Sequence, residues 1–266
     1  STDYMQFICY NLNGEFVGYH EGRYTKFNFD ITKYILEGQN ELVIKVKDIS
    51  DTSYHLRGKQ VLKTTGYFYT TSSGIYKPIW IEEVPGEYII KVKFTPHYDD
   101  NIIEVEAFSD TDGKLGIFLD GKYYEGLMNK KNLIKLENPH SWSYKDPFLY
   151  YVKLFFKDDE VSSYFGFRKI EIKRDKKNRP GIYLNGLLDQ GYYFLGNLTP
   201  SSYGDYEKEI LNLKELGYNT LRKHIKVEND TFYYLCDKYG MLLVQDFVNG
   251  GTPYKFKEVV LPRVFT

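Results

Sequence analysis

Residues 202–246 read SYGDYEKEILNLKELGYNTLRKHIKVENDTFYYLCDKYGMLLVQD, and helical periods alternate with apolar runs along this stretch. Ser202 to Asp205 has the pattern of a capping box at the start of a helix. Gly217 is placed to end that helix in a left-handed conformation. The predicted helix carries one apolar face, which consists of Tyr206, Ile210, Leu213 and Leu216.

The same period continues on both sides of this helix. Residues 219–227 predict a strand, residues 230–239 a second helix closed by Gly240, and residues 241–246 a further strand. A strand-like segment opens at Tyr183. The order β-α-β-α-β with short loops predicts a parallel sheet, either in a βα-barrel or in a doubly wound fold.

The length of the chain limits which of these folds it can complete. A full (β/α)8 barrel takes about 250 residues, whereas only 85 of the 266 residues follow Gly181. About three of eight βα units fit into that length. The N-terminus also opens inside a strand pattern, so we expect a chain that is cut at both ends.

Residues 1–85 read as strands and turns. Asn13-Gly14 predicts a tight hairpin turn, and residues 41–47 alternate as a strand that is polar on one face. Residues 48–66 are too rich in turn residues for one regular element, and residues 75–84 predict another strand. Pro85-Gly86 marks the expected end of this first domain.

Residues 86–174 repeat the β pattern with turns every 8–12 residues, which is typical of an immunoglobulin-like sandwich. Trp142 is expected to be buried there, between Pro139 and Pro147. A charged linker follows and opens a third domain, residues 175–266. The expected strands are 88–94, 102–107, 115–119, 133–136, 149–156 and 164–172.

Composition excludes several classes of protein. Lys and Arg total 35 and Asp and Glu 36, a net charge of −1, which does not fit a nucleic-acid binder or a protein bound to anionic membranes. No apolar run reaches the ~18 residues of a membrane span, and the first residues show no secretory signal. The two cysteines, Cys9 and Cys236, predict free thiols, and neither a metal nor a cofactor is expected.

Several motifs resemble glycoside hydrolase family 2, which includes β-galactosidases, β-glucuronidases and β-mannosidases. They follow one another in the family's order across nearly the whole chain. They are Asn13-Gly14 to Thr32, Gly38-x-Asn40-x-Leu42, Ser73 to Glu82, Pro139 to Tyr150, Phe165 to Ile170, Leu216 to Arg222 and Tyr234 to Gly240.

The resemblance implies a multidomain, mainly β fold: a partial jelly-roll sandwich (1–85), an immunoglobulin-like sandwich (86–174) and the first βα units of an incomplete (β/α)8 barrel (175–266). It also implies retaining hydrolysis of β-glycosides, β-galactosides foremost, by two glutamates on later barrel strands. Those strands would lie beyond Thr266. Asn40-Glu41 precedes a strand of the first domain and reads as a turn, so no catalytic residue is expected in this chain.

Candidate sugar-binding residues stand where the predicted parallel strands end, which is where barrel active sites are built. They are Asp189, Arg222, His224 and Asp246. Two of them depart from the family pattern. Asp189 stands where the family commonly has a histidine-bearing strand, and Arg222-x-His224 replaces Arg-x-x-His, which leaves open whether His224 faces a ligand or is packed.

Two alternatives remain open from the sequence. One is a non-catalytic carbohydrate-binding or scaffold protein of natural length, and the other is a β-sandwich adhesion module, which would leave the βα segment unexplained. Under the hydrolase reading the partner is a β-glycoside substrate, with no nucleic acid and no membrane, and the protein could form a homo-oligomer. The sequence leaves the compartment open.

Overall fold

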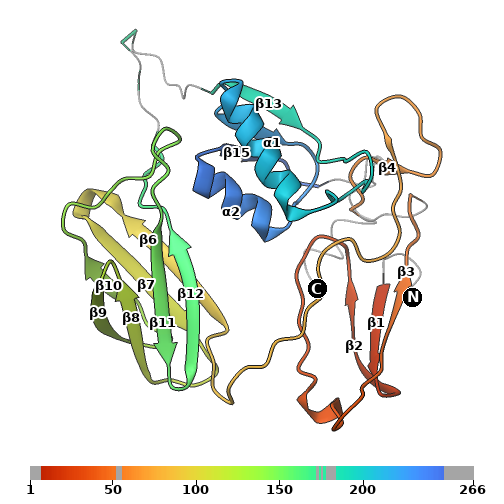
Figure 1. Ribbon diagram of the computed structural model, residues 1–266, viewed down its shortest axis with the longest axis horizontal. Coiled ribbons are helices and arrows are strands. Elements are labelled where there is room, and N and C mark those ends of the chain that lie inside the picture. Colours follow the sequence, from red (N-terminus) through yellow and green to blue (C-terminus); the bar gives the residue numbers. More distant parts are fainter. Residues whose placement is uncertain (1–6, 52–55, 172–173, 175, 178–183, 249–266) are drawn as a thin grey trace, which may run out of the picture.

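The computed structural model describes residues 7–51, 56–171, 174, 176–177 and 184–248, with side chains described from Tyr10 onward. Figure 1 shows three groups of elements: an antiparallel sheet that holds the first strands, two facing sheets, and a helical unit between them. Within the described residues the chain is mainly β, with several separate sheets and two α-helices.

The first group is the antiparallel sheet β2-β1-β3. It consists of β1 (Phe7–Leu12), β2 (Glu15–Glu21) and β3 (Leu42–Lys47). Asn13 and Gly14 form the predicted hairpin turn with φ of 54° and 83°, and Leu12 pairs with Glu15 across it. A short 3-10 helix, Thr32–Tyr34, follows. Two short parallel strands, β4 (Gln60–Val61) and β5 (Tyr69–Thr70), lie in the irregular stretch that follows β3.

The strand predicted for residues 75–84 is wrong, because this segment is extended chain outside any sheet. Its apolar residues do not alternate between a buried and an exposed face: Ile79, Trp80 and Ile81 are all exposed, Trp80 to 67%. Pro78 also removes one backbone donor that a strand would use. The segment instead connects the first sheet to the facing sheets (Figure 1).

The second group consists of two antiparallel sheets that share one core. One has the order β10-β7-β6 and the other β12-β11-β8-β9. Alternate residues of β7, β8 and β11 point inward and are almost fully buried. The strands are β6 (Lys91–His97), β7 (Ile102–Phe108), β8 (Lys114–Leu119), β9 (Lys122–Leu127), β10 (Asn132–Lys135), β11 (Tyr150–Phe156) and β12 (Asp159–Phe165).

Two predictions for this region need correction. The strand predicted for residues 164–172 is β12, Asp159–Phe165, which pairs with β11 across a two-residue turn at Lys157-Asp158. Residues 166–171 lie outside any strand because Gly166 packs against the ring of Trp142. β9 was not predicted, since its burial alternates only weakly. A 3-10 helix at Tyr98–Asp100 is the only helix described between residues 88 and 171.

The third group is the parallel sheet β13-β14-β15 with two helices. Its elements are β13 (Gly186–Asp189), α1 (Tyr203–Glu215), β14 (Thr220–Lys223), α2 (Asp230–Tyr239) and β15 (Leu242–Gln245). The predicted capping box between Ser202 and Asp205 is formed. The helices pack on one face of the sheet, where Leu221 meets Ile210 and Phe232 in a common core.

Two details of this unit differ from the sequence prediction. Leu216 was predicted on the apolar face of the helix, but it is the C-cap that follows α1 and it is exposed. The strand predicted for residues 219–227 stops at Lys223, since the chain reverses at Ile225.

The second group is joined to the helical unit through Trp142, which is buried as predicted and lies outside any strand, as do Pro139 and Pro147. Its indole Nε1 donates to the carbonyl oxygen of Asp237 at 2.7 Å, and the Arg168 guanidinium lies 4.5 Å from the centre of its rings. Arg168 also donates to the Asp237 carboxylate at 2.9 Å. No described helix is long and apolar enough to cross a bilayer.

Candidate functional site

The two faces of the parallel sheet have different surroundings. Leu187, Leu221 and Leu243 are in register on the face that α1 and α2 cover. Leu188, Arg222 and Val244 are in register on the opposite face and are exposed. We call this second face, together with the residues that follow the strands on its side, the open face.

Three of the four predicted site residues meet on the open face. Arg222 Nε and Nη2 donate to Asp246 Oδ1 and Oδ2, both at 3.1 Å. His224 Nδ1 lies 2.8 Å from Asp246 Oδ2. The side chain of Arg222 is 55% exposed, whereas those of His224 and Asp246 are mostly buried. Arg222, His224 and Asp246, which end two neighbouring strands, are called the rim triad below.

The rim triad keeps the Asp246 carboxylate ionised. The hydrogen bonds from Arg222 are the main cause that lowers the pKa of Asp246, and His224 adds to it. An ionised carboxylate accepts hydrogen bonds and donates none. Asp246 is therefore suited to accept from a sugar hydroxyl and unsuited to act as a general acid, which needs a raised pKa.

Asp189, the fourth predicted residue, lies on the other face of the sheet. Its carboxylate is 8% exposed, pairs with Lys223 Nζ and accepts from the backbone N–H of Gly191 at 2.7 Å. The structure therefore does not bring Asp189 together with the other three predicted site residues, because its position in β13 alternates it away from the open face. Its backbone still reaches the site, since His224 N donates to Asp189 O at 2.7 Å.

Asp189 belongs to a buried ionic cluster directly behind the rim triad. Lys223 and Lys226 are 0% and 1% exposed, and their Nζ atoms lie 2.9 and 2.8 Å from Glu228 Oε1. Tyr206 on α1 donates its hydroxyl to Glu228 Oε2 at 2.9 Å. Two ammonium groups thus face two carboxylates, so the cluster is internally compensated, as buried charges must be. Asp189, Lys223, Lys226 and Glu228 are called the ionic cluster below.

Burial and the neighbouring charges act against each other in this cluster. Burial favours the neutral form of Lys223, but Glu228 and Asp189 outweigh it and raise the pKa of the ammonium. Burial likewise works against ionised Glu228, yet Lys223 and Lys226 lower the pKa of its carboxyl. Burial lowers the pKa of Lys226, and Glu228 offsets this only in part. The neighbouring charges therefore favour the charged forms of Lys223 and Glu228 despite their burial.

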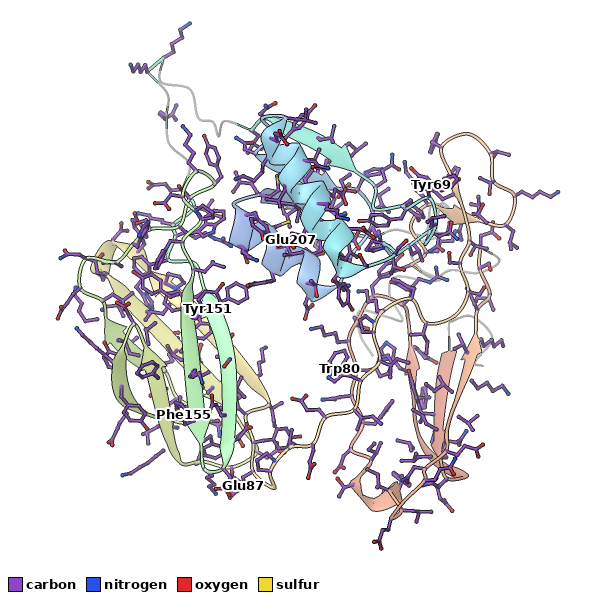
Figure 2. The ribbon with its side chains drawn as sticks, viewed as in Figure 1. Tyr69, Trp80, Glu87, Tyr151, Phe155 and Glu207 are labelled. Carbon is purple, nitrogen blue, oxygen red and sulfur yellow. The ribbon has the colours of Figure 1, made fainter. Side chains whose placement is uncertain are left out.

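Sequence reasoning missed the part of the site that comes from the first group of elements. Lys59 Nζ donates a hydrogen bond at 2.8 Å to Oε1 of Gln190, the residue that follows Asp189. Tyr69 stacks on Tyr192, with ring centroids 3.8 Å apart, and Figure 2 shows Tyr69 on the side of the helical unit that faces the first group. Tyr67 is 70% exposed, and the centroid of its ring lies 5.0 Å from Lys59 Nζ. An exposed tyrosine ring beside an ammonium group can pack against a sugar ring. In the sequence, the three consecutive aromatic residues from Tyr67 to Tyr69 could have indicated this part of the site.

The described residues contain no group of three His, Cys, Asp or Glu side chains that could hold a metal ion. Cys236 is a buried free thiol, as predicted, and burial raises its pKa above the ordinary range. The side chain of Cys9 lies outside the described part of the chain.

Family models match most of the first two groups of elements. Residues 4–85 match the sugar binding domain of glycosyl hydrolases family 2, and residues 103–168 match a second model of glycosyl hydrolases family 2. The chain belongs to glycosyl hydrolase family 2. Both matched ranges agree with the motifs that carried the resemblance in the sequence.

Several relatives of known name share this part of family 2. The chain is 29% identical over 266 residues to a β-galactosidase of Thermoanaerobacter pseudethanolicus, a match that covers 88% of this chain and 35% of the relative. It is 26% identical over 274 residues to a β-galactosidase large subunit of Lactobacillus acidophilus. That match covers 93% of this chain and 42% of the relative. The chain thus spans less than half the length of these curated relatives.

A solved β-D-glucuronidase structure has a similar fold. The β-D-glucuronidase of Dictyoglomus thermophilum superposes with a TM-score of 0.75 at 19% identity, covering 96% of this chain and 50% of that one. At this identity the likeness concerns the fold alone.

Proposed function

We propose that this chain is part of a retaining family 2 β-glycosidase, and that it contributes residues that bind the sugar substrate. In this proposal residues 1–85 form a partial jelly-roll sandwich, residues 86–174 an immunoglobulin-like sandwich, and residues 175–266 the first βα units of a (β/α)8 barrel. Within residues 184–248, both described helices lie on the same face of the parallel sheet, which supports the last assignment. In such a barrel the helix-free face becomes the interior.

The observation that carries the proposal is the position of the rim triad. Arg222, His224 and Asp246 follow or end parallel strands on the open face, and barrel enzymes build their active sites at the carboxyl ends of their strands. Asp246 supplies a fixed acceptor and His224 keeps its second ring nitrogen for a ligand. Together they can bind two hydroxyl groups of a sugar.

A neutral β-galactoside is the proposed substrate in preference to a β-glucuronide. Recognition of a uronate carboxylate calls for an arginine whose fork is available. The Arg222 fork is already occupied on two of its nitrogens by Asp246. The relatives named as β-galactosidases support the same choice.

The chain is proposed to bind the sugar without cleaving it. Retaining hydrolysis needs two carboxyl groups about 5–5.5 Å apart, one of them with a raised pKa. Asp246 has a lowered pKa and is engaged by the side chains of Arg222 and His224. We place the two reacting glutamates outside these 266 residues.

Calorimetric titration tests this proposal. The 266-residue chain is titrated with methyl 1-thio-β-galactoside and, separately, with methyl 1-thio-β-glucuronide. We expect binding of the galactoside with a Kd on the order of 1 mM, about −4 kcal/mol, and weaker binding of the glucuronide. Asp246→Asn should weaken galactoside binding, while Asp99→Asn, a change on the facing sheets, should not.

Equal or stronger binding of the glucuronide would contradict the substrate class, and an unchanged Kd in Asp246→Asn would contradict the site. The gene sequence on both sides of the segment separates the hydrolase from a non-catalytic sugar-binding protein. A continuing reading frame with an Asn-Glu pair about 100–200 residues downstream, a range taken from the size of a barrel, supports the hydrolase.

A further inference from the structure

Ile225 adopts a backbone conformation that its side chain disfavours. Its φ is 54°, in the left-handed region. The other described non-glycine residues with positive φ are asparagines, one aspartate, one serine and one lysine. A β-branched residue in this region is an outlier, which persists only where the surrounding structure fixes it.

The ionic cluster supplies that constraint from both sides of Ile225. Lys223 precedes it by two residues and Lys226 follows it directly, and both ammonium groups contact the same oxygen of Glu228. Lys223 points to the helix side of the sheet because it alternates with Arg222. For Lys226 to reach the same side, the chain must reverse in the single step at Ile225.

The ammonium group of Lys226 is also held in place by two backbone carbonyl oxygens. Its Nζ donates to the carbonyl oxygen of Leu198 at 2.6 Å and to that of Gly191. Gly191 leaves room for this contact only because it lacks a side chain, since a Cβ there would lie 2.7 Å from Lys226 Cδ. The lysine therefore joins the loop after β13 to the loop after β14.

The first group of elements closes on the same turn. Gly58 approaches the backbone of Ile225 so closely that a Cβ on it would lie 2.9 Å from the Ile225 carbonyl oxygen. Lys77 donates to the carbonyl oxygen of Glu228 at 3.2 Å. Two separate segments of the chain, at Gly58 and at Lys77, thus contact the reversal or the residues that follow it.

The reversal determines where His224 points. The backbone N–H of His224 is held by Asp189 O at 2.7 Å, and its ring lies against Asp246 at 2.8 Å. An ordinary extended residue at position 225 would continue the strand and carry Lys226 to the open face. His224 would then lose the fixed end of its segment.

We propose that Lys226 and Glu228 are positioning residues, which hold Ile225 in its left-handed conformation and thereby fix the His224 imidazole on Asp246. The sugar-binding role of His224 rests on the proposed function, whereas the positioning does not. Lys226 and Glu228 are buried and paired with each other and with Lys223, so this proposal gives them no contact with the sugar.

The test uses side-chain NMR of the 266-residue chain without sugar. The readouts are the Asp246 carboxyl titration, followed by ¹³C, and the ¹⁵N shifts of the His224 ring. Lys226→Met should displace the His224 ring from Asp246. The pKa of Asp246 should then rise, because the hydrogen bond from His224 no longer lowers it, and the ¹⁵N shifts of the His224 ring should change. Adding Ile225→Gly should reverse most of both changes, because glycine adopts a positive φ without help from the cluster.

A role limited to stability would give a different result. Lys226→Met would then lower the unfolding midpoint but leave the Asp246 titration unchanged, or Ile225→Gly would fail to restore it. Either result overturns the proposal.

A second pair of variants applies even if Lys226→Met does not fold. Ile225→Gly and Ile225→Ala both remove the side chain, but only glycine relieves the backbone. We expect a higher unfolding midpoint for Ile225→Gly than for Ile225→Ala, the reverse of the usual order of these two residues. A midpoint for Ile225→Gly that is equal or lower would show that no strain is held at this turn.

The two proposals fail separately. Absence of galactoside binding, with the NMR results as expected, contradicts the proposed function and leaves the positioning intact. Galactoside binding that is unchanged by Lys226→Met, in a variant whose His224 shifts have not moved, contradicts the positioning alone.

Discussion

Arg222 and Asp246 are joined by two parallel hydrogen bonds, Nε to Oδ1 and Nη2 to Oδ2, each 3.1 Å long. The pair links the ends of β14 and β15 across the open face. This fork–fork geometry orients both side chains as well as attracting them. Its energetic contribution is modest because the Arg222 side chain is more than half exposed.

Arg222→Met should raise the pKa of Asp246 toward the ordinary aspartate range, because the arginine is the main cause of the lowered value. A lowered folded-state pKa stabilises the fold above the unfolded pKa of about 3.9, and this contribution is lost as the pH falls through the folded value. Urea unfolding of both proteins should therefore show a difference at pH 7 that disappears near pH 2. A difference that is constant with pH would contradict this.

Glu209→Gln should change stability with the opposite pH dependence. Burial raises the pKa of Glu209, with Asp189 as the next cause, and Tyr193 donates to it at 3.1 Å. A raised folded-state pKa contributes stability below the unfolded pKa of about 4.3 that is lost as the pH rises through the folded value. The variant should therefore gain on the wild type as the pH rises from 4 to 7.

Glu207 on the same helix is the matched control for Glu209. A hydrogen bond from Tyr239 is the main cause that lowers the pKa of Glu207, and Figure 2 labels this residue on α1. Glu207→Gln should therefore lose stability relative to the wild type as the pH rises. Similar pH profiles for the two variants would show that the two environments do not differ.

Trp142→Phe should destabilise the junction between the facing sheets and the helical unit. The change leaves the partly buried Asp237 carbonyl without this donor and weakens the contact with Arg168. Together we expect a loss of about 1–3 kcal/mol in the free energy of unfolding. Trp80→Phe, at an exposed position, should cost less than about 0.5 kcal/mol. Equal effects of the two changes would contradict the buried placement of Trp142.

The purified chain should not hydrolyse chromogenic β-galactosides, β-glucuronides or β-mannosides above background. Both nucleophilic and acid–base catalysis require carboxyl groups that the proposed function places elsewhere. Turnover that survives repurification and is abolished by changing one carboxylate of this chain would contradict that assignment. The assay should include Asp246→Asn and Glu228→Gln, the carboxylates nearest the open face and behind it.

The helical unit was the part of the fold most readily predicted from the sequence. α2 has the predicted bounds, because Asn229 and Gly240 mark its two ends with capping residues. Strands lack such end signals, so β6 and β12 lie several residues from their predicted positions. Residues 75–84 have an apolar composition typical of a strand, yet no partner strand lies beside them in the described chain.

The candidate site was predictable only where strand register decides it. Arg222, His224 and Asp246 converge because residues at equivalent ends of neighbouring parallel strands lie side by side. Asp189 was predicted at the end of the first parallel strand and does end β13, but the short strand gave no alternation from which to predict that its side chain lies on the helix side of the sheet. The contact of Lys59 with Gln190 and the approach of Gly58 to Ile225 join segments more than 100 residues apart, for which the local pattern contains no signal.

A crystal structure of the 266-residue chain soaked in concentrated galactose tests the central claim most directly. We expect one sugar on the open face, with a hydroxyl group within hydrogen-bond distance of the Asp246 carboxylate and of the second ring nitrogen of His224. A sugar that occupies only another surface, such as the sheet β2-β1-β3, with the open face empty at saturating galactose, would contradict it.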